Sequence, residues 1–91
     1  MQLKMYSIRD AKAEIFGAPF YKSTHGQAER DFKSLVNDKK SQVWVYPEDF
    51  DLYFIGTYDD STGKVIPKDT PEHLLKAVQL KETTPSLEAV Q

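Results

Sequence analysis

The chain has 91 residues, of which 40% are hydrophobic and 29% charged, and this composition is typical of one folded domain rather than two. No stretch approaches the ~18 consecutive apolar residues of a membrane span, and the first residues lack the apolar run of a signal peptide. The absence of cysteine excludes disulfides and thiolate metal sites. We therefore expect a cytosolic domain held together by its core alone, for which dimer formation would bury further surface.

The net charge of −2 argues against a general nucleic-acid coat protein, which would be strongly basic. The charge is unevenly placed, because residues 1–45 carry eight Lys or Arg and five acids, whereas residues 46–91 carry four and nine. The first half of the chain could therefore present a basic face. The alternative is that its lysines are simply spread over a solvated surface.

The first elements of the chain are expected to be strands. An apolar and aromatic run over residues 3–9, a charged turn, and a second apolar run over residues 13–17 together predict a β-hairpin. Pro19 then ends the hairpin, since proline cannot donate a ladder hydrogen bond. Phe20 and Tyr21 are expected on an irregular, extended segment that leads away from the sheet.

A helix is predicted over residues 25–37. Thr24 has the character of an N-cap, and Gln27 follows it at the spacing of a capping box. Apolar residues then recur at helical spacing and form one stripe that faces the core, namely Ala28, Phe32, Leu35 and Val36.

The second half of the chain is expected to return to the sheet and to end in a helix. Residues 43–46 are β-prone but are interrupted by a proline, and the very apolar residues 51–58 predict the central strand. After a turn in which Gly63 supplies a positive φ, residues 64–66 form a short returning strand. A threonine, a proline and an acid then predict a second helix near residues 71–80.

The predicted fold is therefore an α+β domain, a small antiparallel sheet with one helix packed on it and a second, C-terminal helix. The domain is expected to cover residues 1–81. Residues 82–91 are polar and include a proline, so we expect a flexible C-terminal tail.

No residue pattern in the chain predicts catalysis. His25 and His73 have no neighbouring ligand at metal spacing, and no serine lies in a nucleophile elbow. Glycine-rich phosphate-binding motifs are absent, and the acids Asp59 and Asp60 are explained by a turn. The sequence thus predicts a protein that is not an enzyme and that has no metal site and no cofactor.

Aromatic residues make up 12% of the chain, and several alternate with lysine or arginine. Proteins that bind single-stranded nucleic acid combine base-stacking aromatic side chains with cations that follow the backbone. A small domain also needs bulky residues to fill its core. Phe32 and Phe54 are expected in the core, whereas Phe20, Tyr21, Trp44 and Tyr46 fit either role.

Three blocks of sequence, in order, carry a resemblance to a known family: residues 5–20, residues 32–38 and residues 47–63. Over about residues 3–68 the chain resembles the small nonstructural protein of gokushoviruses, which are microviruses with single-stranded DNA genomes. The resemblance implies a DNA-binding protein made in the host bacterial cytoplasm and absent from the particle. It implies a role when the phage switches from duplex replication to single-stranded progeny genomes.

The resemblance brings no DNA-contact residues with it, so the candidate interface rests on charge and aromatic placement. We predict that phosphates meet Lys4, Arg9, Lys12, Lys22, Lys39 and Lys40, and that bases stack on Tyr21, Trp44 and Tyr46. The predicted function is binding of single-stranded DNA, without strong sequence preference, by a homodimer. The alternative is a dimeric protein-interaction module that engages a viral or host replication protein.

Overall fold

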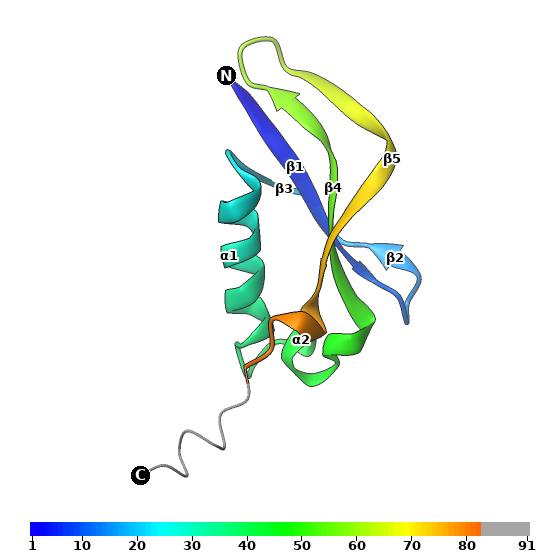
Figure 1. Ribbon diagram of the computed structural model, residues 1–91. Coiled ribbons are helices and arrows are strands. Elements are labelled where there is room, and N and C mark those ends of the chain that lie inside the picture. The colour runs from blue at the N-terminus through cyan, green and yellow to red at the C-terminus, as the bar shows by residue number, and fades with distance from the viewer. Residues whose placement is uncertain (83–91) are drawn as a thin grey trace.

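A curled antiparallel sheet, with one long helix lying along one of its faces, forms the frame of the molecule (Figure 1). The computed structural model describes residues 1–82. The strand order is β2-β1-β4-β5, and β3 also pairs with β1. The strands are β1 (Gln2–Asp10), β2 (Ile15–Phe16), β3 (Phe20–Lys22), β4 (Phe50–Asp59) and β5 (Lys64–Lys76).

Strand β4 is the central strand, as the sequence predicts, and it pairs with β1 on one side and β5 on the other. The register against β1 shifts between Met5 and Tyr6, where Ile55 is the extra residue on β4. Such a bulge bends the strand and increases its local twist, which contributes to the curl of the sheet.

The predicted hairpin and first helix are confirmed. Strands β1 and β2 pair antiparallel at Arg9 and Asp10, and helix α1 spans His25–Val36. The Thr24 hydroxyl accepts a hydrogen bond from the backbone N–H of Gln27 at 3.1 Å, which caps the helix start.

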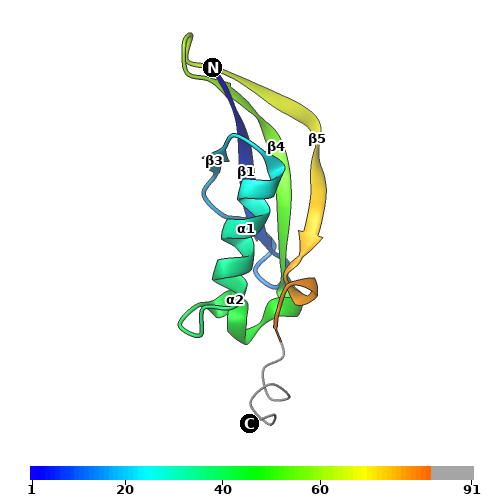
Figure 2. The same ribbon diagram turned by 60° about the vertical axis from the view of Figure 1, so that its left-hand side comes forward.

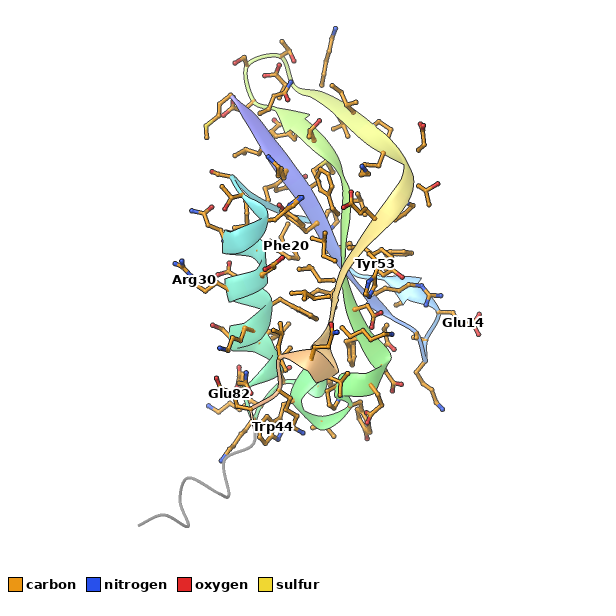
Figure 3. All side chains as sticks on the ribbon, in the orientation of Figure 1. Glu14, Phe20, Arg30, Trp44, Tyr53 and Glu82 are labelled. Carbon is orange, nitrogen blue, oxygen red and sulfur yellow. The ribbon has the colours of Figure 1, made fainter. Side chains whose placement is uncertain are left out.

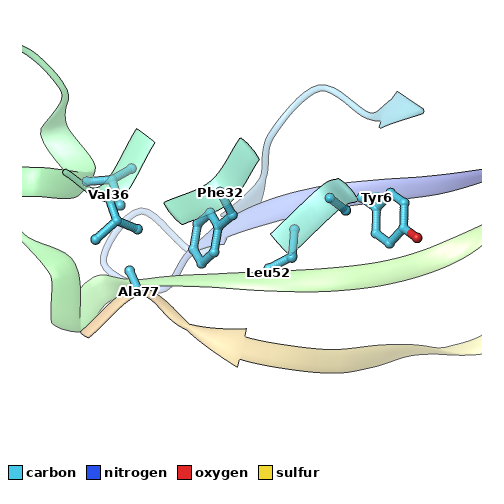
Figure 4. Close-up of a cluster of buried hydrophobic side chains, with 7 residues drawn as sticks. Tyr6, Phe32, Val36, Leu52 and Ala77 are labelled. Atoms are coloured by element: carbon cyan, nitrogen blue, oxygen red, sulfur yellow. The ribbon is translucent and has the colours of Figure 1, made fainter. Parts of the chain in front are cut away.

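The hydrophobic core lies between α1 and the sheet (Figure 4). Phe32 and Val36 of the helix face Tyr6 of β1 and Leu52 of β4, and all four side chains are fully buried. Leu35 and Phe54 pack against this cluster and are partly buried. The predicted packing of the helix on the central strand is therefore confirmed.

The predicted C-terminal helix over residues 71–80 is wrong. Strand β5 continues through Lys76, and a single turn of 3-10 helix, η2 (Ala77–Gln79), follows it. Thr70 and Pro71 have the local character of a helix start, but the long strand β4 offers a partner edge as far as Asp51, which pairs with Lys76. Pro71 is tolerated because β5 is an edge strand, where a missing N–H leaves no ladder bond unmade.

Residues 43–46, predicted to be β-prone, also differ from the expectation. They lie in the short helix α2 (Gln42–Val45) and its C-cap Tyr46. The Ser41 hydroxyl accepts from the backbone N–H of Val43, and Val43 is buried in the core. A further 3-10 turn, η1 (Pro47–Asp49), leads into β4. Burial of Val43 against the end of α1 outweighs the weak β preference of a four-residue stretch.

Phe20 and Tyr21 return to the sheet rather than lead away from it. In β3 they pair with Tyr6 and Met5 of β1. The short strand β2 reaches only Arg9 and Asp10, so the rest of that edge of β1 is free to accept another partner. Pro19 precedes β3 and does not interrupt it.

Figure 2 shows α1 in front of β1 and β4, with β3 to one side and β5 to the other. We call the opposite side of the sheet, which carries Arg9, Tyr53 and Tyr58, the outer face.

The predicted tail over residues 82–91 lies outside the described residues except for Glu82, whose N–H donates to the Asn37 side-chain oxygen at 2.9 Å.

Candidate nucleic-acid interface

The outer face arises from the alternation of side chains along β1 and β4. Leu52 is buried under α1, and Tyr53 is the next residue on β4, so Tyr53 points to the opposite side. Figure 3 shows Tyr53 on the side of the sheet away from α1, close to β2, whereas Phe20 lies between the sheet and the helix.

Three aromatic rings and one guanidinium group form a row across this face. The Phe16 and Tyr53 ring centroids are 5.2 Å apart, and those of Tyr53 and His73 are 5.3 Å apart. The Arg9 guanidinium carbon lies 5.6 Å from the Phe16 ring centroid. Because these residues come from β2, β4, β5 and β1, the row crosses the sheet. We call it the aromatic row.

The ends of the aromatic row are fixed by polar contacts. Ser7 is 1% exposed, and its hydroxyl donates to the Gly17 carbonyl oxygen at 2.8 Å, which holds the β2 hairpin that carries Phe16. At the other end, His73 Nε2 and Asp51 Oδ2 lie 2.8 Å apart, and Lys76 Nζ is 3.6 Å from the same oxygen. Phe16 nevertheless remains 44% exposed.

A second aromatic contact lies further along the same face. Tyr21 of β3 and Tyr58 of β4 have ring centroids 5.6 Å apart, and we call them the upper tyrosine pair. Tyr21 is 43% exposed, and its register partner Met5 is buried. The outer face thus carries two sets of aromatic rings.

Two of the predicted phosphate contacts lie on the other side of the sheet. Lys4 and Lys22 are register partners on β1 and β3, and Lys4 also pairs with Thr57. Lys22 Nζ forms an ion pair with Asp31 Oδ2 at 2.6 Å. Tyr21 is the neighbour of Lys22, but it projects to the outer face.

Lys12 and Tyr46 line the same surface depression near the end of α2. The depression has a volume of about 400 Å³ and is also lined by Asp10 and Asp49, so the positive charge of Lys12 is offset by two carboxylates. Tyr46 is 52% exposed and caps the end of α2.

Lys39 and Trp44 form a separate group near α2. Lys39 Nζ lies 5.9 Å from the Trp44 ring centroid, and Lys81 Nζ lies closer, at 4.3 Å. Lys40 is exposed in the preceding turn, where its N–H donates to Asp38. Arg9 is thus the one predicted cation on the aromatic row, and the nine predicted residues lie in several groups rather than in one groove.

Sequence reasoning did not select Phe16, Tyr53, Tyr58 or His73. A signal was present for Tyr53, because strict alternation places it opposite the two core residues on either side of it. The sequence predicts a helix start around His73, whereas its strand position depends on the pairing of β5 with β4.

Among residues 1–82, the structure shows neither a metal site nor a membrane-spanning helix. No three His, Asp or Glu side chains gather as a metal site within residues 1–82. Over the same range, no helix has the length and apolarity needed to cross a membrane. The expectation that the protein is not an enzyme stays a prediction.

The fold and the outer face define a small α+β protein with an exposed aromatic surface on a curled sheet. The sequence profile of the phage ORF5 protein family matches residues 3–80, and the chain belongs to this family. It is similar to Protein ORF5 of Chlamydia phage 1, with 37% identity over 73 residues, which covers 76% of each chain. No solved structure matches the chain.

These matches confirm the sequence-based expectation of a bacteriophage protein of the gokushovirus type. They also support its class, a phage nonstructural protein.

Proposed function

We propose that this phage protein binds single-stranded DNA during viral genome replication in the host bacterial cytoplasm, and that the outer face of the sheet is its binding surface. The observation that carries the proposal is the aromatic row, in which Tyr53 makes edge-to-face contacts with Phe16 and with His73, and Arg9 lies beside Phe16.

Exposed aromatic rings on a sheet are suited to unpaired bases. Stacking of a base on an aromatic side chain contributes about 1–3 kcal/mol and tolerates any sequence, because every base has a π-face. The ring of Phe16 is exposed and that of His73 is oriented by Asp51. Arg9 adds a positive charge that can meet a phosphate or stack on a base.

The net charge of −2 sets a limit on the electrostatic part of binding. Affinity falls with salt in proportion to the number of phosphates neutralised. With Arg9 and Lys76 as the cations beside the aromatic row, we expect a salt dependence equivalent to about two phosphates for each bound protomer. Stacking rather than charge then supplies most of the affinity.

The test is a titration of fluorescein-labelled oligo-dT, followed by anisotropy at two salt concentrations. We expect Tyr53→Leu and Phe16→Leu to weaken binding by about 5- to 150-fold with an unchanged salt slope, which corresponds to the loss of one stacking contact. Arg9→Ala should weaken binding and reduce the slope. Tyr46→Leu is the matched control, since it removes an exposed tyrosine at the end of α2 that, among the described residues, makes no contact with the aromatic row.

Two results would contradict this assignment. If Tyr53→Leu, Phe16→Leu and Arg9→Ala all bound oligo-dT like the parent, the outer face would not be the interface. If instead Lys39→Glu with Lys40→Glu weakened binding while Tyr53→Leu did not, the interface would lie beside α2, among the residues that the sequence selected.

The alternative, a dimeric protein-interaction module, draws support from a different observation. Val65 and Ile66 on the edge strand β5 are both more than half exposed, and exposed apolar side chains are common at protein interfaces. A flat oligo-dT titration at low salt would favour this alternative over nucleic-acid binding.

A further inference from the structure

We infer that a bound single strand runs along β4 and stacks at two stations, the aromatic row and the upper tyrosine pair, which a β-bulge at Ile55 brings to the same face. This inference rests on the proposed function and adds the path and the minimum length of the bound strand.

The bulge decides where Tyr58 points. Tyr53 and Tyr58 are five residues apart, so in a regular strand their side chains would lie on opposite faces of the sheet. The register against β1 shifts at Ile55, and as a result Tyr53 pairs with Ser7 while Tyr58 pairs with Leu3. Ser7 and Leu3 are four residues apart and share one face, so both tyrosines project to the outer face.

The contacts of the two tyrosines confirm this placement. Tyr53 touches Phe16 and His73, and Tyr58 touches Tyr21, whose partner on β1 is Met5. Met5 belongs to the same side of β1 as Ser7, lies between the register partners of Tyr53 and Tyr58, and is 9% exposed. The floor between the stations is therefore apolar and filled, as a surface for stacked bases requires.

The spacing of the stations sets the length of strand that can use both. Four residues of β1 separate the register partners, which corresponds to about 13 Å along the strand. Stacked nucleotides rise about 3.4 Å each along one strand. Tyr53 and Tyr58 are therefore about four nucleotide steps apart, and a strand of about five nucleotides is needed to stack on both tyrosines.

The two stations differ in charge. Arg9 lies on Phe16, and Lys76 is near Asp51 at the end of the aromatic row, whereas the upper tyrosine pair has no cation among the aromatic contacts of the described residues. A short oligonucleotide should therefore occupy the aromatic row first. The upper tyrosine pair should contribute only when the strand is long enough to reach it.

The test measures affinity for oligo-dT of two to twelve nucleotides with the parent protein, Tyr53→Leu and Tyr58→Leu. We expect Tyr53→Leu to weaken binding at every length. Tyr58→Leu should bind dT2 and dT3 like the parent but dT8 at least about fivefold more weakly, the loss of one stacked base. Circular dichroism of each variant checks that the fold is retained.

A crosslinking experiment gives a second readout that does not depend on a variant folding. Oligo-dT with one 5-iodouracil, moved along the chain, should crosslink to Tyr53 and to Tyr58 from positions about four nucleotides apart. Crosslinks to both residues from the same or adjacent positions would overturn the inference.

The inference and the proposed function fail in different ways. A parent protein that binds oligo-dT at all lengths, with Tyr58→Leu equal to it throughout, retains the proposed function and removes the second station. A parent protein that binds no oligonucleotide removes both.

Discussion

Lys81 makes two contacts with Trp44, one with its ring and one with its backbone. Its Nζ lies 4.3 Å from the centroid of the indole ring and donates a hydrogen bond to the carbonyl oxygen of Trp44 itself at 3.0 Å. The neighbouring residues are fastened as well, because the Asn37 side-chain amide donates to the Leu80 carbonyl oxygen at 3.1 Å. These contacts tie the segment that follows β5 to the ends of α1 and α2. The ammonium group of Lys81 also lies over the Trp44 ring, which the sequence analysis predicts as a surface for base stacking.

We therefore predict that Lys81→Ala lowers the free energy of unfolding by about 1–2 kcal/mol, through the loss of a cation–π contact and a charged hydrogen bond. Urea denaturation followed by Trp44 emission measures this. Lys64→Ala is the control, since Lys64 is exposed at the start of β5, and it should change stability by less than about 0.5 kcal/mol. Equal stability of the two variants would show that the contact contributes nothing.

Burial makes Tyr6 sensitive to alkaline pH. Its side chain is fully buried, and this burial, aided by the negative charge of Glu29, raises the pKa of Tyr6 to about 12 from an ordinary value of 10. The folded state therefore binds the phenolic proton more tightly than the unfolded state, and stability that is fully present below pH 10 is lost as the pH rises towards 12.

The loss should reach about 2 kcal/mol near pH 12. Urea unfolding between pH 9 and 12 measures this loss of stability in the parent, in Tyr6→Phe and in the control Tyr46→Phe. Tyr6→Phe should remove this part of the pH dependence and, at neutral pH, cost about 1 kcal/mol because the 2.7 Å hydrogen bond with His25 is lost. Parallel pH profiles for all three proteins would refute the assignment.

Gly56 is required by a close approach of two strands. A Cβ atom at this position would lie 2.6 Å from the Ile66 carbonyl oxygen and 3.0 Å from the Pro67 Cα, both backbone atoms of β5. We expect Gly56→Ala to lower the melting temperature, at a cost of about 1–3 kcal/mol. Gly26→Ala in α1 is the contrasting control, because its Cβ would meet no atom closer than 3.9 Å, and it should be neutral or stabilising by up to about 1 kcal/mol.

Glu14 adopts a left-handed backbone conformation, with φ of 62°, in the turn between β1 and β2. Glycine adopts this conformation without strain, whereas β-branched residues resist it. We predict that Glu14→Gly is neutral or stabilising by up to about 1 kcal/mol and that Glu14→Val is destabilising by about the same amount. Thermal denaturation measures both. The same Gly substitution at Glu48, whose φ is not positive, should destabilise; a matching response at the two sites would contradict the explanation.

The homodimer stays a prediction. Residues 52–58 carry apolar or aromatic side chains on both faces of β4, and α1 covers one face while the outer face carries the aromatic row and the upper tyrosine pair. Sedimentation velocity at tens of micromolar should show a dimer. Repeating it with saturating oligo-dT tests whether DNA and a second copy compete for the outer face, and a strictly monomeric species in both experiments would exclude the dimer.

The sequence by itself determined the elements whose signals are local. The stripe from Ala28 to Val36 and the cap at Thr24 specify α1, because helical spacing and capping act within a few residues. The turn at Gly63 and the apolar run of β4 could be predicted for the same reason. The three sequence blocks likewise indicated the phage family that the profile match then showed.

Tertiary structure alone decided the rest, because those features depend on residues far apart in the chain. Pairing with β4 extended β5 across a sequence with the character of a helix start, and pairing with β1 returned Phe20 and Tyr21 to the sheet. The bulge at Ile55 has no local signature, since it is a mismatch in length between two paired strands. It is this mismatch that turns Tyr58 to the side of Tyr53, and so the candidate binding face exists only once the strands have paired.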